Sequence, residues 1–390
     1  MINIVKETKQ DCCGCNACEQ ACPTKCITME FDEEGFKYPK IDINKCIGCD
    51  KCEKVCPVII SSNNKNSEIN IKPKTVGGWH KNDEVRERSS SGGAFTLLAE
   101  YVLKNNGIVF GAALNKNLQV NHIGVETIDE LDKLRGSKYV QSDTQDTYWK
   151  VKENLETGRM VLFVGTSCQA AGLGSFLNKE YDKLFVCDFI CHGVPSPLVF
   201  KKYIDYLETK YKDKVIDFKF RNKDMGWRQT GQQMGTAVKF KEKEIKRFMP
   251  AYKDSFMNGF LSDIYLRPSC HKCAFKTIPK NYSDFTIADF WGVDSVVSDL
   301  NDKKGTSLVI FNTKKGEKLF DKIKDNFYFK ECSFDKAIRR NPTLLRATKK
   351  SKNREKFFRE LSEQNFKVLR IRYMTAFSWA FERGKKFLNK

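Results

Sequence analysis

The chain has 390 residues, of which 41% are hydrophobic and 30% charged, and its formal net charge is +19. This length allows two or three domains, and the apolar content excludes disorder throughout. The sequence has no run of about 20 apolar residues that could span a membrane, and its first ten residues lack a signal-peptide core, so we expect a cytoplasmic protein.

Sixteen cysteines are the most informative part of the composition. In a reducing cytoplasm they would not form a disulfide framework, which favours metal or redox chemistry. Charge is uneven along the chain, because residues 1–60 carry eight basic and ten acidic side chains, whereas residues 346–390 carry fourteen and four. An acidic head and a basic tail indicate a partner-facing tail rather than a nucleic-acid groove, so we expect no nucleic-acid partner.

One cysteine spacing, C-x2-C-x2-C-x3-C-P, occurs at residues 12–23 and again at 46–57. It is the bacterial pattern for two 4Fe-4S clusters, in which the fourth cysteine of each run binds the other cluster. One cluster would then be held by Cys12, Cys15, Cys18 and Cys56, and the other by Cys46, Cys49, Cys52 and Cys22. Two structural zinc sites are the alternative, although zinc prefers paired C-x2-C knuckles separated by a loop.

The rest of this first region predicts a small domain. Cys13 and Cys26 fall outside the spacing and are expected to be small buried residues. Residues 27–43 predict two short strands around a Glu-Gly turn, and the polar stretch 61–74 is typical of a flexible linker. We therefore predict an α+β ferredoxin-like dicluster domain at residues 1–60, followed by a linker at 61–74.

From residue 75 onward, apolar runs alternate with amphipathic segments. Helices are expected at residues 92–106, 197–211 and 314–327, and a short helix should follow a Gly-rich turn after residue 165. Strands are expected at residues 107–114, 159–165, 183–190, 214–220, 235–248 and 307–313. These elements predict a larger α/β domain with a mixed sheet at residues 75–345, followed by a basic helical tail at 346–390.

The tail places apolar side chains at helical spacing among basic residues: Phe366, Leu369, Tyr373, Phe377 and Ala380. A basic amphipathic helix of this kind suits an anionic membrane surface or an acidic partner. Packing of the helix on its own domain is the alternative that we favour.

Four cysteines of the larger domain lie on three predicted loops. Cys168 and Cys191 each follow a predicted strand, at the edge of an α/β sheet where ligands bind, while Cys270 and Cys273 form a C-x2-C pair in a turn-rich segment. Four thiolates on these loops would suit a third 4Fe-4S cluster, with a zinc site or plain buried cysteines as alternatives. The neighbouring histidines, expected to make neutral hydrogen bonds beside the metal, are His192 and His271.

A segment rich in serine and glycine, residues 89–93, precedes the first helix of this domain. Exposed amides at a helix N-terminus suit a phosphate, and hydroxyls can donate further bonds. N-capping of the helix by Ser90 or Ser91 explains the serines equally well.

Other segments combine cations with small or aromatic residues. Arg135 and Lys138 lie in one of them, and a second contains Arg221, Lys223, Trp227 and Arg228. Such mixtures suit an anionic, planar cofactor, although a solvated basic loop is the alternative. Two aspartates that could polarise a flavin or a substrate, or cap a turn, are Asp284 and Asp289.

Taken in order, these motifs resemble the beta subunit of coenzyme F420-reducing hydrogenase and formate dehydrogenase. The resemblance covers about residues 75–330 and is carried by SSSGGAF, LRGSKYVQS, GTSCQ, DFICHGVPSP, FRNKDMGW, RPSCHKCAFK and SDFTIADFWG. It implies FAD and a 4Fe-4S cluster, with Cys168, Cys191, Cys270 and Cys273 as ligands of this third cluster. It also implies flavin contacts at Ser89, Ser90, Ser91, Gly92, Gly93, Arg135, Ser137 and Lys138.

The predicted function is that of a FAD- and iron–sulfur-dependent oxidoreductase, with no side chain assigned as a catalyst. FAD would exchange hydride with an F420-like deazaflavin or a similar coenzyme, and 4Fe-4S clusters would pass single electrons to a redox partner protein. One alternative is a flavin-free electron-transfer accessory protein, because similar proteins occur beside bacterial polysaccharide genes. A zinc-stabilised scaffold is a weaker alternative.

Overall fold

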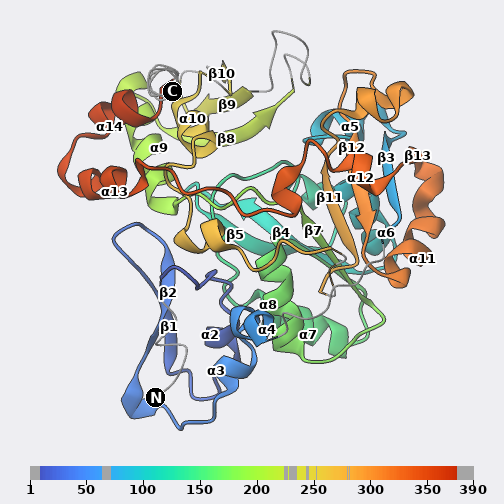
Figure 1. Cartoon of the computed structure of the whole chain (residues 1–390), viewed down its shortest axis with the longest axis horizontal. Coiled ribbons are helices and arrows are strands. Elements are labelled where there is room, and N and C mark those ends of the chain that lie inside the picture. Colours follow the sequence, from blue (N-terminus) through green and yellow to red (C-terminus); the bar gives the residue numbers. More distant parts are fainter. Residues whose placement is uncertain are drawn as a thin grey trace, which may run out of the picture.

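The computed structural model describes residues 9–63, 72–223, 227, 235–242, 246–251, 253–278, 280 and 282–375. Three residues singled out in the sequence lie outside this part of the chain: Arg228, Phe377 and Ala380. The predicted fold class is confirmed, since a small α+β head is followed by a larger α/β body with a mixed sheet (Figure 1). Within the described residues, no helix is long and apolar enough to cross a membrane.

The head consists of short helices and one hairpin. Its elements are α2 (Ala17–Ala21), β1 (Ile27–Phe31), β2 (Lys37–Ile41), α3 (Lys51–Lys54) and α4 (Pro57–Asn63). The two predicted strands pair antiparallel, and the turn between them forms because Asp32 Oδ1 accepts the amides of Glu34 and Phe36 at 3.1 and 2.9 Å. Gly35 completes the turn with φ +80°, where a Cβ would lie 2.2 Å from Leu198 of the body.

The body is built on one eight-stranded sheet. In chain order its strands are β3 (Thr75–His80), β4 (Ile108–Leu114), β5 (Val120–Val125), β6 (Val161–Gly165), β7 (Leu184–Phe189), β11 (Phe285–Asp289), β12 (Ser307–Phe311) and β13 (Phe327–Glu331). They lie in the order β13-β3-β12-β11-β7-β6-β4-β5, with the four strands β11, β7, β6 and β4 parallel and the others antiparallel. The carboxyl ends of the four parallel strands therefore share one edge, where ligands bind in α/β folds.

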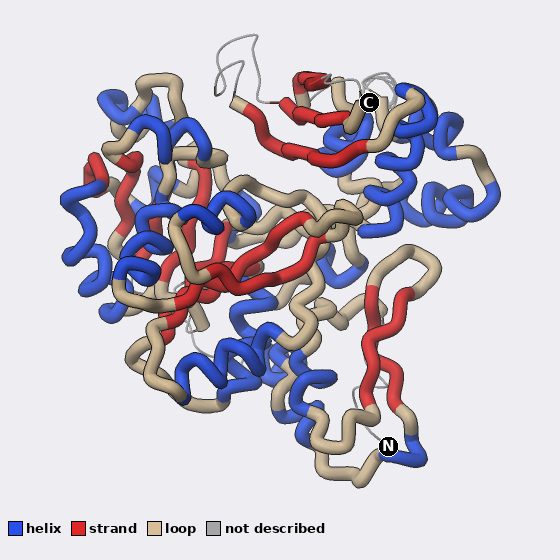
Figure 2. Tube along the Cα trace, turned by 180° about the vertical axis from the view of Figure 1, so that it is seen from behind, coloured by secondary structure: helices blue, strands red, loops and turns tan. Residues whose placement is uncertain are grey.

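Helices cover both faces of this sheet (Figure 2). They are α5 (Asp83–Arg88), α6 (Ala94–Lys104), α7 (Thr147–Glu156), α8 (Ser167–Leu177), α11 (Lys314–Ile323) and α12 (Phe334–Ala337). On β4, Val109 packs with α6 and α11, while Ile108 and Phe110 pack with α7 and α8. This alternation is the period of two that a strand buried on both faces requires.

A second lobe was not separated by the sequence. Its elements are α9 (Pro197–Tyr211), β8 (Val215–Asn222), β9 (Gly235–Phe240), β10 (Lys246–Pro250), α10 (Ser255–Leu261), α13 (Arg354–Glu363) and α14 (Phe366–Tyr373). The three strands form an antiparallel sheet of their own, in the order β10-β9-β8. The tail packs here up to residue 375, because Phe357, Leu361 and Leu369 are buried in the aromatic core of this lobe.

Three local expectations need correction. The strand expected at 235–248 is two strands, β9 and β10, and the helix expected at 314–327 ends at Ile323, since the apolar residues that follow pair with β3 as β13. No Gly-rich turn follows β6, because Thr166 and Gln169 form a capping box that starts α8 at once. The glycines of that segment lie inside the helix.

Several contacts dock the head on the body, among them one near α2 and one at the hairpin turn. Near α2, the backbone oxygen of Gln20 accepts Trp149 Nε1 at 2.7 Å, and its side-chain oxygen accepts the amide of Tyr148 at 2.9 Å. At the hairpin turn, both carboxylate oxygens of Glu34 pair with the guanidinium of Arg354 at the start of α13. The head is therefore tied to both helix α7 and the second lobe (Figure 1).

Candidate metal centres and cofactor site

The two cysteine runs of the head share a backbone conformation as well as a spacing. Gly14 and Asn16 in the first run have φ of +67° and +64°, and Gly48 and Asp50 in the second have φ of +66° and +53°. Left-handed residues at alternate positions turn the chain sharply. Each run therefore forms a tight loop, as close wrapping of thiols around one centre requires.

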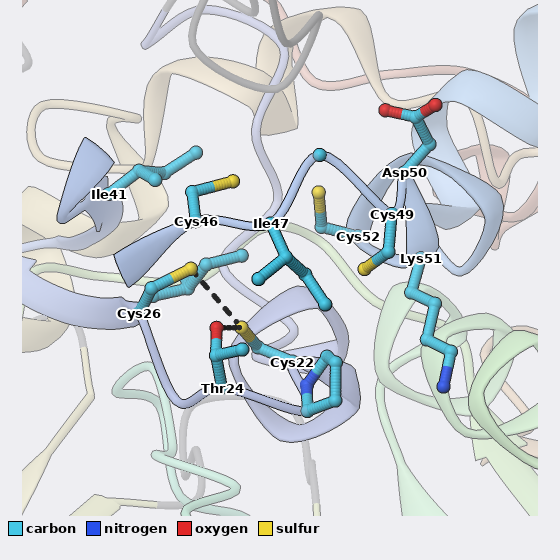
Figure 3. A pocket seen from close by; sticks show the side chains of 13 residues that line it. Cys22, Thr24, Cys26, Ile41, Cys46, Ile47, Cys49, Asp50, Lys51 and Cys52 are labelled. Carbon is cyan, nitrogen blue, oxygen red and sulfur yellow. Dashed lines mark hydrogen bonds between the residues drawn. The ribbon is translucent and has the colours of Figure 1, made fainter. Parts of the chain in front are cut away.

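One set of four thiols surrounds a hollow at the outer end of the head. These residues are Cys22, Cys46, Cys49 and Cys52, hereafter the outer group, and their sulfur atoms face a common space (Figure 3). Cys26 lines the same hollow, with its Sγ 3.4 Å from that of Cys22. Cys26 is buried as expected, but it faces the hollow.

The other four predicted thiols, Cys12, Cys15, Cys18 and Cys56, form the inner group between the outer group and the body. Burial raises the pKa of the Cys18 thiol, and the neighbouring thiols of Cys12 and Cys56 raise it further. Several thiolates at this position would therefore repel one another without a compensating cation. An iron–sulfur core supplies such a positive centre, so the inner group fits the predicted occupant.

The third predicted set, Cys168, Cys191, Cys270 and Cys273, is called the body group. Cys168 lies in the first turn of α8 directly after β6, Cys191 follows β7, and the last two lie in and after the 3-10 turn Pro268–Lys272. All four are partly buried. Residues about 100 positions apart in the sequence are thus brought to the carboxyl edge of the sheet.

The thiols of the body group interact with one another electrostatically. Burial raises the pKa of Cys191 to about 11, an effect that nearby Lys276 opposes and that Cys168 and Cys273 reinforce. Burial also raises the pKa of Cys270, and the nearby thiol of Cys191 raises it further. A cationic centre between them would hold these thiols ionised, which is the condition for metal ligation.

Cys13 occupies a place that its sequence context did not indicate. Its thiol lies beside those of Cys15 in the inner group and Cys168 in the body group. The inner group and the body group therefore adjoin each other through Cys13. Only the position next to Cys12 could have drawn attention to it, and that position says nothing of a partner 155 residues later in the sequence.

Among the residues that the structure describes, no three His, Cys, Asp or Glu side chains meet closely enough to share one metal ion. The assignment of all twelve thiols as ligands stays a prediction, supported by their grouping and burial. The neighbouring histidines bond elsewhere: His192 Nε2 lies 2.7 Å from Asp263 Oδ1, and His271 Nδ1 lies 3.0 Å from the backbone oxygen of Thr348.

The predicted flavin contacts converge on one surface region. Ser137 donates its amide to Ser90 Oγ at 2.9 Å, which joins the loop 89–93 to the segment 135–138. Trp227 Nε1 donates to the backbone oxygen of Ser90 at 3.2 Å, and Lys223 Nζ donates to that of Ser91 at 3.0 Å. The three basic or Gly-rich segments are therefore neighbours in space.

The carboxyl end of β11 closes the same region. The ring of Trp291 stacks on that of Trp227, with centroids 5.2 Å apart and planes at 8°. Arg221 pairs with Asp289 at 2.7 Å, and both side chains are almost fully buried. Asp284 lies at the opposite end of β11, where it accepts the amide of Val186 at 2.9 Å and the hydroxyl of Thr313, so its role is structural.

N-capping by Ser90 or Ser91 is wrong. The residue that caps α6 is Gly93, with φ +90°, and no side chain bonds the first-turn amides. The serine hydroxyls bond backbone oxygens outside the loop instead: Ser89 Oγ donates to the backbone oxygen of Val85 at 2.7 Å, and Ser91 Oγ to that of Thr306 at 2.8 Å. Backbone amides, rather than hydroxyls, are thus the groups this loop offers to a phosphate.

Two of the predicted cations also have internal partners. Lys138 Nζ donates to the backbone oxygens of Lys133, Leu134 and Arg135 at 3.1, 2.9 and 2.9 Å. Arg135 donates to Thr96 Oγ1 at 3.2 Å and pairs with Asp132. Burial lowers the pKa of Lys138 to about 7, so this side chain is a weaker anchor for an anion than its sequence context suggests.

A groove of about 1080 Å³ lies between the hairpin and the body. Its walls include Phe31, Lys37, Gln141 and Phe200, and none of the predicted ligand or flavin residues. Its charges are mostly paired, as in Lys37–Asp143 at 2.6 Å. The groove therefore results from the docking of the hairpin on the body, and it adds no residue to the candidate site.

Comparison with known proteins found matches to family models and to solved structures. The family model for the beta subunit of coenzyme F420 hydrogenase/dehydrogenase matches in two parts, its N-terminal part at residues 75–147 and its C-terminal part at 158–337, and a 4Fe-4S dicluster domain matches at 11–60. Among solved structures, a chain of the F420-reducing NiFe hydrogenase complex from Methanosarcina barkeri is similar, with 16% identity, a TM-score of 0.46, and coverage of 71% of this chain and 90% of that one. No curated protein matches.

Proposed function

Because the chain belongs to the coenzyme F420 hydrogenase/dehydrogenase beta-subunit family and carries a 4Fe-4S dicluster domain, we propose that this iron–sulfur oxidoreductase is a flavoprotein with three clusters. Its substrate is a hydride-carrying coenzyme of the deazaflavin type, and its partner is a redox protein that meets the head. Bound FAD supplies the conversion between two-electron hydride chemistry and one-electron transfer through the clusters.

The observation that carries this proposal is that the three groups of thiols adjoin one another, from the body to the surface of the head. The body group adjoins the inner group through the contact of Cys13 with Cys168, and the inner group adjoins the outer group within the head core. The outer group ends at the surface, where Cys49 is exposed and Ile47 is 67% exposed. This order supports a route from the sheet edge through the head to a docked partner.

The residues at the carboxyl edge of the sheet support a flavin site there. Asp289 and Trp291 lie at the end of β11, and Cys191 lies just beyond the end of the adjacent parallel strand β7. At this edge, the uncapped amides of α6 bind phosphate, the Trp227–Trp291 pair limits access of water, and Arg221 is held in place by Asp289. Each of these groups holds or shields the flavin and takes no part in the chemistry, so the proposal assigns no catalytic side chain.

A flavin-free electron-transfer protein is the second candidate. It is favoured by the internal bonding of the predicted contacts, since the hydroxyls of Ser89 and Ser91 and the ammonium of Lys138 already have protein partners. In that case the same three thiol groups would relay electrons between two partner proteins.

The decisive experiment is anaerobic purification followed by quantification of iron, sulfide and flavin. Stoichiometric FAD with about twelve irons per chain supports the proposal, whereas about twelve irons without flavin supports the flavin-free candidate. Zinc in place of iron, or a colourless protein, contradicts both. Reduction by deazaflavin and nicotinamide donors on the same sample then tests the substrate class.

Two variants connect the body group to the metal content. In Cys270→Ser, about a third of the iron should be lost while the signals of the head persist. In the control Cys332→Ser, iron should be unchanged, because that partly buried thiol only donates to the backbone oxygen of Thr75. Unchanged iron in Cys270→Ser would remove Cys270 from the ligand set.

A further inference from the structure

Arg267 is a buried arginine at the junction of head and body. Its side chain is 0% exposed, which makes it the largest fully buried side chain in the described residues. Its backbone belongs to the body, where its amide donates to the oxygen of Val194 at 2.9 Å and its own oxygen accepts the amide of Cys270 at 3.0 Å. Its guanidinium reaches from there into the head.

Four hydrogen bonds hold this guanidinium, and two of them are made to Cys12 of the inner group. Nε donates to the backbone oxygen of Cys12 at 2.8 Å, and Nη2 donates to Cys12 Sγ at 3.6 Å and to the backbone oxygen of Lys37 at 2.9 Å. Nη1 donates to Gln141 Oε1 at 3.0 Å, and Gln141 Nε2 in turn donates to the backbone oxygen of Cys13 at 3.1 Å. The side chain therefore holds the start of the first cysteine run.

Two rings of the hairpin cover the remaining faces of the guanidinium. Its central carbon lies 4.2 Å from the ring centroid of Tyr38 and 5.4 Å from that of Phe36. These contacts fix the plane of the guanidinium and exclude water from it.

The counter-charge of this cation is unusual. No carboxylate within the described parts of the chain pairs with Arg267. Burial lowers the pKa of its guanidinium, whereas the neighbouring Cys12, Tyr38, Cys13 and Cys270 raise it. A buried cation without a carboxylate partner is stabilised by negative charge nearby, and the sulfur of Cys12, which accepts from Nη2, is the group that can carry it. A cluster held by thiolates carries that charge.

We propose that Arg267 is a positioning residue that compensates the charge of the inner-group cluster and fixes it against the body group. The inference rests on the proposed function in one respect, namely that the inner group holds a 4Fe-4S cluster. A cation and an N–H···S bond at a ligand sulfur favour the more negative, reduced state, and thereby raise the reduction potential of that cluster. Within the part of the chain that the structure describes, the outer group makes no hydrogen bond with this side chain, so the potential of the outer cluster should not depend on Arg267.

Arg354 provides a matched control. Its side chain is 4% exposed, it also joins the body to the head, and its guanidinium lies 4.6 Å from the ring centroid of Phe358. Its partners are the carboxylate of Glu34 and the backbone oxygen of Leu266, at 2.9 Å from Nε, and none is a thiol. Loss of Arg354 thus weakens docking of the head without removing charge from a cluster.

The test is an anaerobic redox titration of the full chain by electron paramagnetic resonance, with dithionite as reductant, for the wild type, Arg267→Gln, Arg267→Lys and Arg354→Gln. In Arg267→Gln, one head signal should need a more negative potential, with about a tenfold lower ratio of reduced to oxidised cluster at fixed potential, since a hydrogen bond to a charged group is lost. In Arg267→Lys, the potential of this cluster should lie between those of Arg267→Gln and the wild type, because lysine keeps the positive charge but lacks the planar guanidinium with its several N–H donors. Arg354→Gln should match the wild type.

Wild-type potentials in both Arg267 variants would overturn the inference, as would an equal shift in Arg354→Gln. If Arg267→Gln yields no folded protein, Arg267→Lys decides, and a wild-type potential in it counts against the inference. Iron and sulfide are measured on every sample. A wild type without head clusters contradicts the proposed function itself, whereas head clusters with unshifted potentials contradict only the role of Arg267.

Discussion

Gly14 and Gly48 hold the same place in the two cysteine runs and the same left-handed backbone, with φ of +67° and +66°, but only Gly14 faces another part of the protein. A Cβ on Gly14 would lie 2.7 Å from Nη1 of Arg267 and 2.8 Å from Nε2 of Gln141, whereas a Cβ on Gly48 would meet nothing within 4 Å. The first cysteine run, hereafter the inner run, is thus packed against the body at Gly14. The second run has no such contact at Gly48.

This difference gives a paired prediction for alanine substitutions. Gly48→Ala should cost only the left-handed strain of a residue with a Cβ, about 1 kcal/mol of unfolding free energy. Gly14→Ala should cost the same strain plus displacement of Arg267 and Gln141, for a total of about 2–4 kcal/mol. Chemical unfolding of the iron-loaded proteins measures both values, and equal losses would show that the inner run does not press on the body.

A second prediction separates the two thiols that meet at the junction. Cys168→Ala should remove about a third of the iron, since it deletes a predicted ligand of the body group. Cys13→Ala should keep the full iron content, because the predicted spacing leaves this thiol outside the ligand sets. Iron and sulfide analysis of anaerobically purified variants distinguishes them, and loss of iron in Cys13→Ala would make Cys13 a ligand.

The cysteine runs could be recognised in the sequence because their information is local. Cubane ligation by short spacings leaves a pattern within eleven residues, and the body strands could be found because buried parallel strands are continuous apolar runs. The carboxyl-edge placement of Cys168 and Cys191 followed from the same strands. The structure places Cys168 and Cys191 after β6 and β7 at this edge, and the role of the body group as a ligand set stays a prediction.

What the sequence did not reveal depends on distant partners. Arg267 contacts Cys12 across 255 residues, so a lone arginine before a C-x2-C pair gave no sign of its position. The separate lobe around β8 was missed because the residue pattern shows where strands lie but not which sheet they join. Capping by Ser90 or Ser91 was a sound local expectation, but the serine hydroxyls bond to distant segments, and Gly93 takes the cap.

A third prediction concerns the stacked tryptophans. Trp291 supports Trp227, which holds the backbone oxygen of Ser90 in the loop that should bind the flavin phosphate. Trp291→Leu removes the stack and loosens that hydrogen bond, worth together about 1–2 kcal/mol, so FAD should be retained about tenfold more weakly. Flavin and iron measured on the same sample provide the check, with iron as internal control. Unchanged flavin affinity would place the cofactor elsewhere.

The fourth prediction is a pH dependence that arises at His122. This side chain is 3% exposed on β5, its ring stacks on Phe163, and its Nε2 donates to the backbone oxygen of Val164 at 3.1 Å. Within the described residues its Nδ1 has no hydrogen-bond partner, so the ring is neutral with its proton on Nε2. Burial lowers its pKa from 6.5 to about 4.

The sign follows from proton binding in the two states. Between pH 6.5 and 4 the unfolded chain binds a proton at this histidine that the folded protein does not, so acidification favours unfolding across this window and the effect levels off below it. At pH 5 the loss is about 2 kcal/mol of unfolding free energy relative to pH 7.5. In His122→Gln, which keeps an N–H donor near Val164, this part of the acid destabilisation should vanish. The measurement is the difference in urea-unfolding free energy between wild type and variant at pH 5.0, 6.0 and 7.5, and a difference that does not change with pH would show that His122 is protonated equally in both states.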